Sequence, residues 1–594
     1  MYCYKCGTKL ADDLSYCQSC GAEIGQGQTH ETKPATHKKM RTRKKGIFIA
    51  GITGVIVCAI TIGLLFVFGV FGEKQNIAAD NVVEPDEEIG DSIIEKNDGW
   101  VDSGVDISVN LGLSSPAFFI NNYKYARLSS QLGEFRITYY IDGEEMDSTN
   151  SGDYMDKPVD LTVIYEYVED DLNFEFTIKN LMILDTDWDL SIDIEDYSKA
   201  DVLVVKDYNS SFDLMELEKL SGLETLYLLA SYDSIEGISE LKNLKELHLS
   251  HLEIDNIDAL NGMSGLRKLS VRNMSINDIS GLENLKSLEV LKLENLPLLF
   301  DTSPLEGLEK LKRIVLGEMQ IDNVDALRNL VMLEEIIIFE SENLTDISGL
   351  SNLKALKRLE IGDISTDLYI EDLDAIAGLT ELELLSLISI STNSDADLLR
   401  NLTKLEELTL FGLDFEDISA ISDLNNLERL MLAHLDIKDI DAIENLGNLK
   451  HLTIFGWRLE NIDAVTNLTS LKSLKIVYSY LSNIEPIGDL ENLENLLLYK
   501  LEIDSIDVVG NLTGLETLYL RDLQIDDISV IGQLKELEWL FMMSLENIKE
   551  INVLLDLKRL EFVYIWSLED MVSLDQNDAQ QVLNELENRD VEVH

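Results

Sequence analysis

A repeated leucine pattern constrains this chain more than any other feature. Pairs of apolar residues, separated by one position, run from Leu226/Leu228 to Val563/Ile565. The step between pairs is mostly 22 residues, with a few of 23, one of 21 and one of 26. A unit of this length cannot bury its apolar face alone, so neighbouring units must stack into a continuous core. The repeat therefore predicts a solenoid.

One unit shows how the pattern folds. Its apolar positions Leu402, Leu405, Leu408 and Leu410 precede Asp417-Ile418. Leu408 and Leu410 are alternate residues of a strand, so they point to the same side and add one buried leucine row per coil. The Asp-Ile pair begins the return segment on the convex side. We predict an α/β solenoid over residues 185–570 with a parallel β-sheet on its concave face, and a C-terminal capping helix over 571–594.

The pattern resembles that of the leucine-rich-repeat family, especially the 22-residue bacterial type of internalin-like surface proteins. The resemblance spans Leu217 to Ile565 and implies a horseshoe. The family usually places asparagine three residues after the second strand leucine, where its amide satisfies backbone groups along the stack. In this chain the slot is apolar, at Leu252, Met274, Leu296, Met319, Leu413, Leu435, Trp457, Leu501 and Leu523. An apolar ladder replaces the polar one, which leaves the curvature and hydrogen bonding of that corner open.

Aromatic residues recur at strand positions that point outward onto the concave face. They are Phe339, Phe411, Phe455, Tyr499 and Trp566 after the apolar pair, Tyr519, Phe541 and Tyr564 within it, and Trp539 before it. Scattered surface aromatics need no explanation. Stacking at a fixed period makes these residues neighbours, however, and a contiguous aromatic strip marks a protein-binding surface. We therefore predict a protein ligand at the concave face.

The first 26 residues carry two copies of a cysteine knuckle. Cys3 and Cys6 form the first, and Cys17 and Cys20 form the second. Four thiolates at this spacing suit a structural zinc ion in a closed tetrahedral site, without which so short a segment would not fold. The pattern resembles the short zinc ribbons at the N-terminus of many bacterial membrane proteins. Two disulfides or an iron site are the alternatives, and docking or regulation is favoured over DNA binding as the role of the ribbon.

An uncharged stretch over residues 46–72 predicts one transmembrane helix, because about 20 apolar residues cross a bilayer. A secretory signal peptide is the alternative, but its apolar region is shorter. The basic linker over 27–45 precedes the helix, so the positive-inside rule places the N-terminus in the cytoplasm and the body outside. Residues 73–98 read as an acidic linker. The period of two over 99–184 predicts a small β domain or an N-terminal cap.

The charge of the chain excludes some partners. It has 48 Lys and Arg against 110 Asp and Glu, a formal net charge of -62. This argues against nucleic acid, whose binding needs the opposite sign. Divalent cations would temper the self-repulsion. The acidic residues of the return segments, such as Asp255, Asp278, Asp322 and Asp417, suit either calcium or, as we favour, a solvated convex surface.

No nucleophile-base arrangement, phosphate loop or metalloprotease helix appears, so we expect no enzyme. The leading hypothesis is a membrane-anchored cell-surface binding protein, an adhesin or receptor. A transmembrane signalling protein that couples an extracellular ligand to the ribbon is one alternative. A cell-envelope scaffold without a specific ligand is the other.

Overall fold

The computed structural model describes residues 135–141, 144–145, 159–167, 172–185, 200–207, 212–362, 364, 367–456, 458–545, 547–566, 576–589 and 591–593. The predicted zinc ribbon, both linkers and the stretch 46–72 lie outside these residues. Within the described part, no helix has the length and apolar character needed to cross a membrane.

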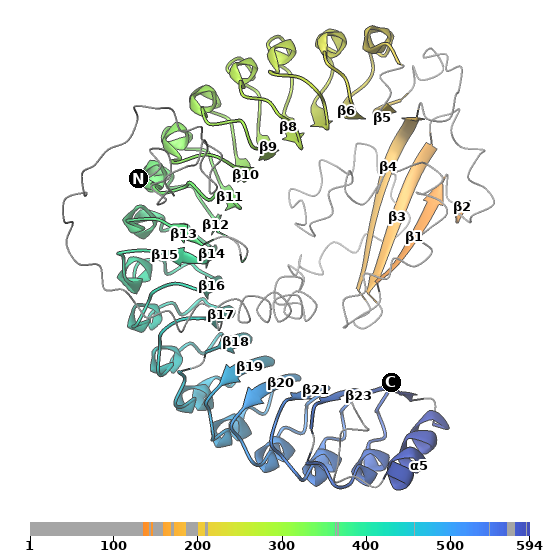
Figure 1. Ribbon diagram of the computed structural model, residues 1–594, viewed down its shortest axis with the longest axis vertical. Coiled ribbons are helices and arrows are strands. Elements are labelled where there is room, and N and C mark those ends of the chain that lie inside the picture. Colours follow the sequence, from red (N-terminus) through yellow and green to blue (C-terminus); the bar gives the residue numbers. More distant parts are fainter. Residues whose placement is uncertain are drawn as a thin grey trace, which may run out of the picture. The chain divides into compact units, whose positions relative to one another are not determined.

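A stack of parallel strands forms where the repeat predicts it. Each coil contributes one short strand and a return segment that mostly contains a 3-10 turn, and Figure 1 shows the strands on the inner side of the stack and the turns on its outer side. The strands are β5 (Val202–Asp207), β6 (Thr225–Ala230), β7 (Glu246–Ser250), β8 (Lys268–Arg272), β9 (Val290–Leu296), β10 (Arg313–Met319), β11 (Glu335–Phe339), β12 (Arg358–Ile361), β14 (Leu384–Ile388), β16 (Glu407–Phe411), β17 (Arg429–Ala433), β18 (His451–Phe455), β19 (Ser473–Ser479), β20 (Asn495–Leu501), β21 (Thr517–Arg521), β22 (Trp539–Met543), β23 (Phe562–Trp566) and β24 (Glu592–Val593). The turns are η4 (Leu214–Lys219), η5 (Glu236–Glu240), η6 (Asp258–Leu260), η7 (Ser280–Leu282), η8 (Ser303–Gly307), η9 (Asp325–Leu327), η10 (Ser348–Asn352), η11 (Asp374–Gly378), η12 (Ala396–Leu399), η13 (Ser419–Ile421), η14 (Asp441–Ile443), η15 (Asp463–Asn467), η16 (Glu485–Asp489), η17 (Asp507–Asn511), η18 (Ser529–Gln533) and η19 (Asn552–Asp556).

Successive strands pair in register at the repeat step. Leu408 of β16 lies beside Leu430 of β17, which lies beside Leu452 of β18. All three side chains are at most 2% exposed and belong to one core cluster that runs along the whole stack. Burying a leucine stabilises a fold by about 1.5–3 kcal/mol, and here the burial of each row depends on the next coil. The predicted leucine-rich-repeat solenoid is confirmed.

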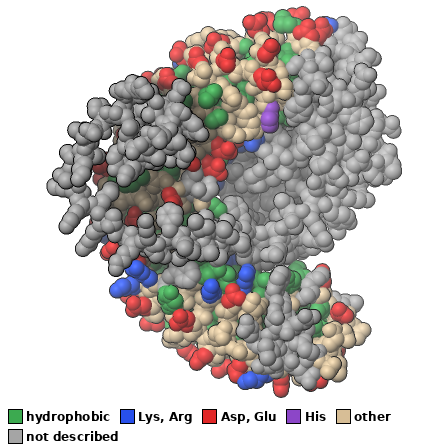
Figure 2. All heavy atoms as spheres, in the orientation of Figure 1, with side chains coloured by type: hydrophobic (Ala, Val, Ile, Leu, Met, Phe, Trp, Pro, Cys, Tyr) green, Lys and Arg blue, Asp and Glu red, His purple; other side chains and the backbone are tan. Residues whose placement is uncertain are grey.

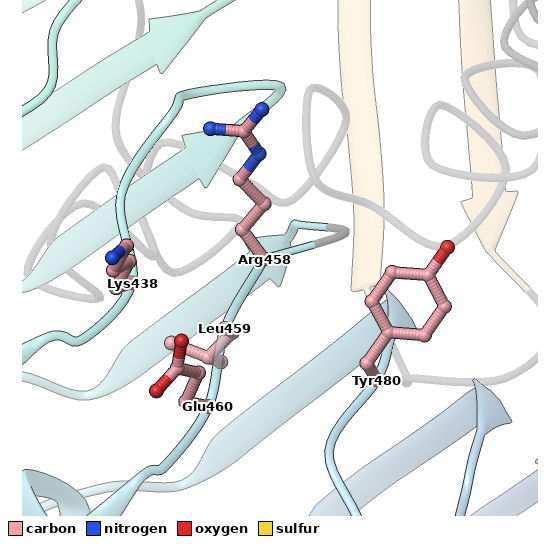
Figure 3. Close-up of a pocket in the computed structure, with 5 residues that line it drawn as sticks. All are labelled: Lys438, Arg458, Leu459, Glu460 and Tyr480. Carbon is pink, nitrogen blue, oxygen red and sulfur yellow. The ribbon is translucent and has the colours of Figure 1, made fainter.

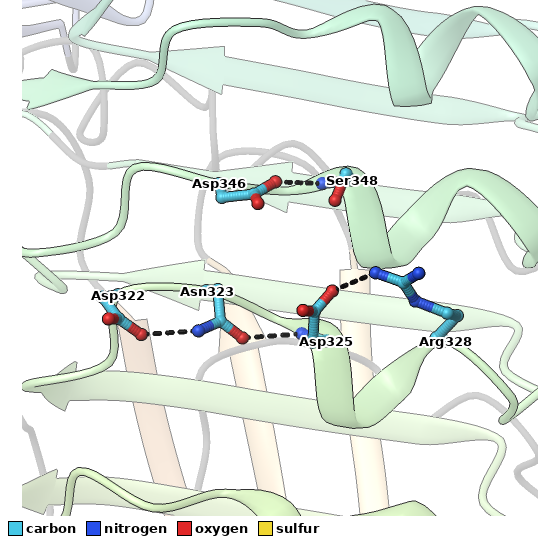
Figure 4. A network of polar contacts seen from close by, with 6 residues as sticks. All are labelled: Asp322, Asn323, Asp325, Arg328, Asp346 and Ser348. Carbon is cyan, nitrogen blue, oxygen red and sulfur yellow. Dashed lines mark hydrogen bonds and ion pairs between the residues drawn. The ribbon is translucent and has the colours of Figure 1, made fainter.

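An Asp or Asn side chain caps most of the 3-10 turns on the outer side (Figure 4). Asp346 Oδ1 accepts a hydrogen bond of 2.7 Å from the backbone N–H of Ser348, and Asn323 Oδ1 accepts one of 3.0 Å from that of Asp325. Such a cap satisfies a donor that the turn itself leaves unused. The predicted Asp-Ile and Asn-Ile pairs therefore begin the return segments for a physical reason.

At the corner after the strands, backbone hydrogen bonds take the place of the asparagine that leucine-rich repeats usually carry. The backbone N–H of Gly412 donates to the carbonyl of Ala433 at 2.9 Å, and that of His434 donates to the carbonyl of Phe455 at 2.8 Å. These bonds extend the ladder between coils by one residue beyond the strand. They require a left-handed backbone, with φ 65° at Gly412 and 52° at His434. The apolar slot that follows, such as Leu413, is buried.

This left-handed column continues along the stack at residues other than glycine. It includes His251, Asn273, Asn295, Glu318, Glu340, Ser389, His434, Tyr478, Lys500, Asp522 and Ser544, with φ between 46° and 63°. Backbone bonds between coils and an apolar row therefore close this corner, in the place of asparagine side chains.

Antiparallel strands precede the stack, in the region where alternation predicts them. They are β1 (Phe135–Ile141), β2 (Glu144–Glu145), β3 (Val159–Tyr167) and β4 (Leu172–Asp185). The first part of β4 pairs with β3, and its last five residues pair in parallel with β5. The antiparallel strands thus join the edge of the solenoid sheet through β4.

Two features interrupt or end the repeat. The long step of 26 residues contains β13 (Leu368–Tyr369), which forms a separate two-stranded sheet with β15 (Ile390–Ser391) of the next step. After β23, the helix α5 (Gln576–Glu587) packs Ala579 and Leu586 into the end of the core, and β24 then pairs with β23.

Candidate functional site

The outward residues of β6 to β23 form a surface that we call the strand face. It has three columns, which hold the residue before the first core position of each strand, the residue between the two core positions, and the residue after the second. By register, every aromatic residue that the sequence predicts for ligand binding belongs to these columns.

Five rings form a ladder along one edge of the strand face, and we call it the edge ladder. It consists of Phe411, His434, Phe455, Tyr478 and Tyr499. Successive ring centroids are 4.9, 4.2, 5.1 and 4.6 Å apart. The two tyrosine hydroxyls are hydrogen-bonded at 2.5 Å. Contacts of this kind stabilise by about 0.5–1.5 kcal/mol per pair beyond the area that they bury.

The ladder alternates between two adjacent positions from coil to coil. Glycine follows the rings of Phe411 and Phe455, and Lys500 follows that of Tyr499, whereas at Ala433 and Val477 the next residue carries the ring. The pairs are Phe411-Gly412, Ala433-His434, Phe455-Gly456 and Val477-Tyr478. Phe411, Phe455 and Tyr499 are at most 6% exposed. The structure thus places three of the predicted binding residues in a buried stack, and their contact with a ligand stays a prediction.

A second group of rings lies at the C-terminal end of the strand face, and we call it the terminal aromatic cluster. It consists of Tyr519, Trp539, Phe541, Phe562 and Tyr564. The Trp539 and Phe562 rings stack at 5.1 Å, and Phe541 lies 5.5, 5.3 and 6.4 Å from Tyr519, Phe562 and Tyr564. Tyr519 and Phe541 are buried, whereas Trp539, Phe562 and Tyr564 are half-buried. This cluster brings together four of the nine predicted aromatic residues.

The two remaining predicted residues lie apart from these groups. Phe339 covers Gly317 of the preceding coil, where a Cβ atom would come within 2.2 Å of the Phe339 ring. The irregular coil around β13 and β15 separates it from the edge ladder. Trp566 ends β23, in the column of Phe411 and Phe455, and only its backbone is described.

The sequence prediction missed four residues of the two groups and their surroundings. His434 and Tyr478 belong to the edge ladder although they follow the strand position that was counted. Phe562 is in the same column as Trp539, 23 residues later, so the repeat step was a usable signal. Arg521 lies with its guanidinium 4.6 Å from the ring centroid of Tyr499 and extends the ladder as a cation.

Burial shifts the pKa values of titratable groups in and near the edge ladder. It lowers the pKa of His434 to about 4, so the imidazole is neutral near pH 7. Burial, together with the hydrogen bond to Tyr478, raises the pKa of Tyr499. Burial also lowers the pKa of His451 to about 4, with a further contribution from the charge of Arg429. His434 and Tyr499 are therefore uncharged at neutral pH, and Arg521 adds a positive charge beside Tyr499.

The N-terminal half of the strand face carries charged residues beside a stacked pair of rings, Tyr227 and His248. Glu246 accepts a hydrogen bond of 2.9 Å from His248 and lies 3.6 Å from Lys268. Burial opposes the charge of Glu246, but His248 and Lys268 outweigh it and lower the pKa of that carboxyl. Arg313 forms an ion pair of 3.2 Å with Glu335. Charges on this half are thus paired between neighbouring coils.

An open hollow lies beyond the carboxyl ends of the strands, between the coils of β17, β18 and β19 (Figure 3). Lys438, Arg458, Leu459, Glu460 and Tyr480 line it, and its volume is about 410 Å³. Tyr480 is 60% exposed. The aliphatic and aromatic parts of this hollow and its mixed charges suit a contact with a polar protein surface.

Acidic residues of the convex surface cap the 3-10 turns. Asp278 and Asp417 each cap the following turn through one carboxylate oxygen, at 2.8 and 2.7 Å. Among the described residues, no group of three or more His, Cys, Asp or Glu side chains is placed to hold a metal. Figure 2 shows acidic side chains over the outer surface of the early repeats, with few basic ones among them. The four cysteines of the predicted zinc site lie outside the described residues.

The stacked parallel strands, the 22-residue step and the aromatic strand face define a leucine-rich-repeat solenoid. No protein-family profile matches the chain, and no curated protein sequence matches it. Among solved structures, an internalin from Listeria monocytogenes is 26% identical, with coverage of 60% of this chain and 89% of the internalin and a TM-score of 0.40.

Two other solved structures are similar to the chain. A leucine-rich-repeat protein of Leptospira interrogans is 20% identical, covers 64% of this chain and 91% of its own, and has a TM-score of 0.49. The leucine-rich-repeat ectodomain of a plant membrane receptor kinase from Arabidopsis thaliana, in complex with Casparian strip integrity factor 2, is 19% identical. The alignment covers 67% of this chain and 60% of the ectodomain, with a TM-score of 0.44.

Proposed function

We propose that this protein is a membrane-anchored, adhesin- or receptor-like surface protein that binds a protein ligand on its strand face. The terminal aromatic cluster carries the proposal. Trp539, Phe562 and Tyr564 come together from two successive strands and each keeps part of its ring exposed. Tryptophan and tyrosine that are partly shielded by neighbours are the residues that dominate the binding energy of protein interfaces.

The test compares two surface substitutions on the full-length chain in detergent micelles. The amount of protein captured from a cell-surface extract is quantified for wild type and for Trp539→Ala/Tyr564→Ala. We expect the double variant to lose most of the captured ligand, since removal of a central aromatic contact costs about 2 kcal/mol or more. That corresponds to a loss of affinity of about thirtyfold.

The matched control is Val331→Ala/Met332→Ala. These two side chains are 57% and 46% exposed and precede β11, away from the strand face. The control variant is expected to bind as wild type does. Equal binding by wild type and Trp539→Ala/Tyr564→Ala would refute a strand-face role. Capture of no protein by wild type would favour a scaffold without a specific ligand.

The anchor belongs to the same proposal. Residues 46–72 would span the membrane once, with the N-terminus in the cytoplasm and the solenoid outside. Protease treatment of intact cells is expected to digest the solenoid and to spare an N-terminal tag. A solenoid that stays intact until the cells are lysed would contradict this orientation.

Zinc is the cofactor that we propose for the N-terminal segment. Cys3, Cys6, Cys17 and Cys20 would hold one structural Zn²⁺, since four thiolates leave no open position for catalysis. Elemental analysis of the purified chain is expected to find one zinc per chain, and none in Cys3→Ser/Cys6→Ser. One equivalent of iron with little zinc would show the other metal that this ligand set accepts.

A further inference from the structure

An exposed apolar turn lies on the edge of the solenoid that follows the carboxyl ends of the strands. After β9 the backbone N–H of Leu299 donates to the carbonyl of Leu296 at 3.0 Å and closes this turn. Leu299 is buried, but Leu298 and Phe300 on either side of it are 47% and 63% exposed. We call Leu298 and Phe300 the apolar knob.

Two other coils contain the same turn, and its geometry does not require apolar residues there. The corresponding backbone hydrogen bonds after β11 and β22 are 3.0 and 3.4 Å long. The first knob position holds Asn343 and Asn547 in those coils, and their amides donate to the preceding coil at 2.7 and 3.3 Å. The second position holds Thr345 and Lys549, which also bond to the preceding coil. Leucine and phenylalanine cannot form such bonds, so a contact outside the stack explains the knob better.

The edge around the knob is acidic. In the five coils from β7 to β11, the segments from the left-handed corner residue to the Asp or Asn that caps the next turn are 251–256, 273–278, 295–301, 318–323 and 340–346. These segments contain no Lys or Arg. Their nine acidic residues are Glu253, Asp255, Asp278, Asp301, Glu318, Asp322, Glu340, Glu342 and Asp346.

We propose that the apolar knob binds a basic segment of a partner protein, in which lysine or arginine residues flank an apolar patch. The patch would bury Leu298 and Phe300, and the removal of apolar surface from water is the main favourable contribution to such contacts. The flanking cations would meet carboxylates of the next coil, at Glu318 and Asp322, in charge-assisted hydrogen bonds. This contact lies outside the strand face, so it does not depend on the function proposed above.

Charge favours this partner over two other occupants of an exposed apolar surface. A second copy of the chain that docked through the same edge would bring carboxylates against carboxylates, and like charges across an interface oppose association. A membrane surface that contains anionic lipids would repel the edge for the same reason. A basic segment of a protein is attracted by the acidic edge and can also bury the knob.

The test uses two labelled 10-residue peptides and the full-length chain in nanodiscs of phosphatidylcholine, a lipid without net charge. One peptide alternates lysine with valine, and its twin has glutamate in place of each lysine. Binding is measured by fluorescence anisotropy at 0.15 M salt, with protein-free nanodiscs as the blank. We expect the lysine peptide to bind at least about tenfold more tightly than its twin, and to bind more weakly at 0.5 M salt, which screens exposed charges.

A double substitution locates the site. The knob variant, Leu298→Asn/Phe300→Thr, introduces the residues that the equivalent turn after β11 carries, so the turn is retained and the net charge is unchanged. It should weaken the lysine peptide at least about tenfold, because two apolar contacts are lost. The matched control variant, Val331→Asn/Met332→Thr, changes an exposed apolar pair that precedes β11, and it should alter binding less than about twofold.

Neutralisation of charge tests the acidic part of the site. Glu318→Gln/Asp322→Asn keeps the knob and should weaken the lysine peptide at least about threefold, with a smaller effect of salt. Glu306→Gln/Glu309→Gln makes the same change in net charge at exposed residues before β10, and it should change binding less than about twofold. Circular dichroism and thermal unfolding confirm that each variant is folded.

The outcomes decide between the occupants. Equal binding of the lysine peptide by wild type and the knob variant would overturn the proposal, and so would equal losses in the knob variant and the control variant. If the knob variant binds the peptide as wild type does but sediments as a smaller species, the occupant is a second copy. If only wild type floats with phosphatidylserine vesicles, the occupant is a membrane. Trp539→Ala/Tyr564→Ala should bind the lysine peptide as wild type does, so this proposal and the strand-face function can fail separately.

Discussion

Replacing Leu413 by asparagine would introduce, at the corner after β16, the residue that leucine-rich repeats usually carry in this slot. Here the Leu413 side chain is 2% exposed, and the neighbouring N–H of Gly412 already donates to Ala433. Loss of the buried leucine costs about 1.5–3 kcal/mol. Burial of an amide without a full set of partners costs about 1–3 kcal/mol more. We therefore expect Leu413→Asn to destabilise this part of the stack by about 3–5 kcal/mol.

The assay is hydrogen exchange of the amides in β16 and β17, because a long repeat array does not unfold in one step and a single melting temperature would average over coils. A local loss of about 3 kcal/mol lowers protection by about two orders of magnitude. The matched control is Leu413→Ala, which removes the apolar contacts and adds no polar group. Leu413→Asn should lower the protection of these amides at least as much as Leu413→Ala does. Protection in Leu413→Asn equal to wild type, or above that of Leu413→Ala, would refute the apolar, backbone-bonded corner.

Three further perturbations test other parts of the stack. Gly281→Ala places a Cβ within 2.2 Å of the Ile257 carbonyl oxygen of the preceding coil. We therefore expect a local loss of about 1–3 kcal/mol in hydrogen exchange of η6 and η7, and unchanged exchange would show that the coils are not in close contact there. The pKa of His434 is lowered to about 4 in the fold, so the unfolded chain binds the proton first and local stability falls as the pH drops from about 6.5 to 4. His434→Phe should reduce that pH dependence of hydrogen exchange in β17 and β18, and an unreduced one would argue against a buried neutral imidazole. The backbone N–H of Ser529 donates to Asp527 and lowers its pKa, so this carboxylate stabilises the fold above its unfolded pKa, and the effect is lost as the pH falls through its pKa in the fold. Asp527→Ala should abolish this pH dependence of hydrogen exchange in η18, and a retained dependence would assign it to another group.

Much of the fold followed from the sequence because its determinants are periodic. Rows such as Leu408, Leu430 and Leu452 repeat at the step of the coil, so counting placed them side by side as the register does. The corner could not be predicted in the same way. Whether an N–H finds a backbone or a side-chain acceptor depends on a left-handed φ at residues such as His434, and that angle is not visible in residue type.

The candidate site was predicted in part for the same reason. Counting along one column identified Phe411, Phe455 and Tyr499, but not His434 and Tyr478, which fill the gaps from the adjacent position. The rings of the edge ladder alternate between two positions, so each position carries a ring only in every second coil. Counting along one position therefore finds every second ring. The burial of Phe455 also follows from the alternation, since its ring contacts another ring on both sides and offers little of its face to a ligand.

The position of an aromatic ring along the stack determines whether it packs only against neighbouring rings or also has surface for a ligand. In the middle coils a ring such as Phe455 has a ring on each side. At the end this changes, because β24 pairs with β23 only at Phe562 and Val563 within the part of the chain that the structure describes. Tyr564 lies just beyond that pairing and contacts Phe541 on the side of the preceding coil. Trp539 and Tyr564 are half-buried, whereas Phe455 is 2% exposed. We therefore place the first contact with a protein ligand at Tyr564 and Trp539 and expect substitutions there to affect binding more than stability.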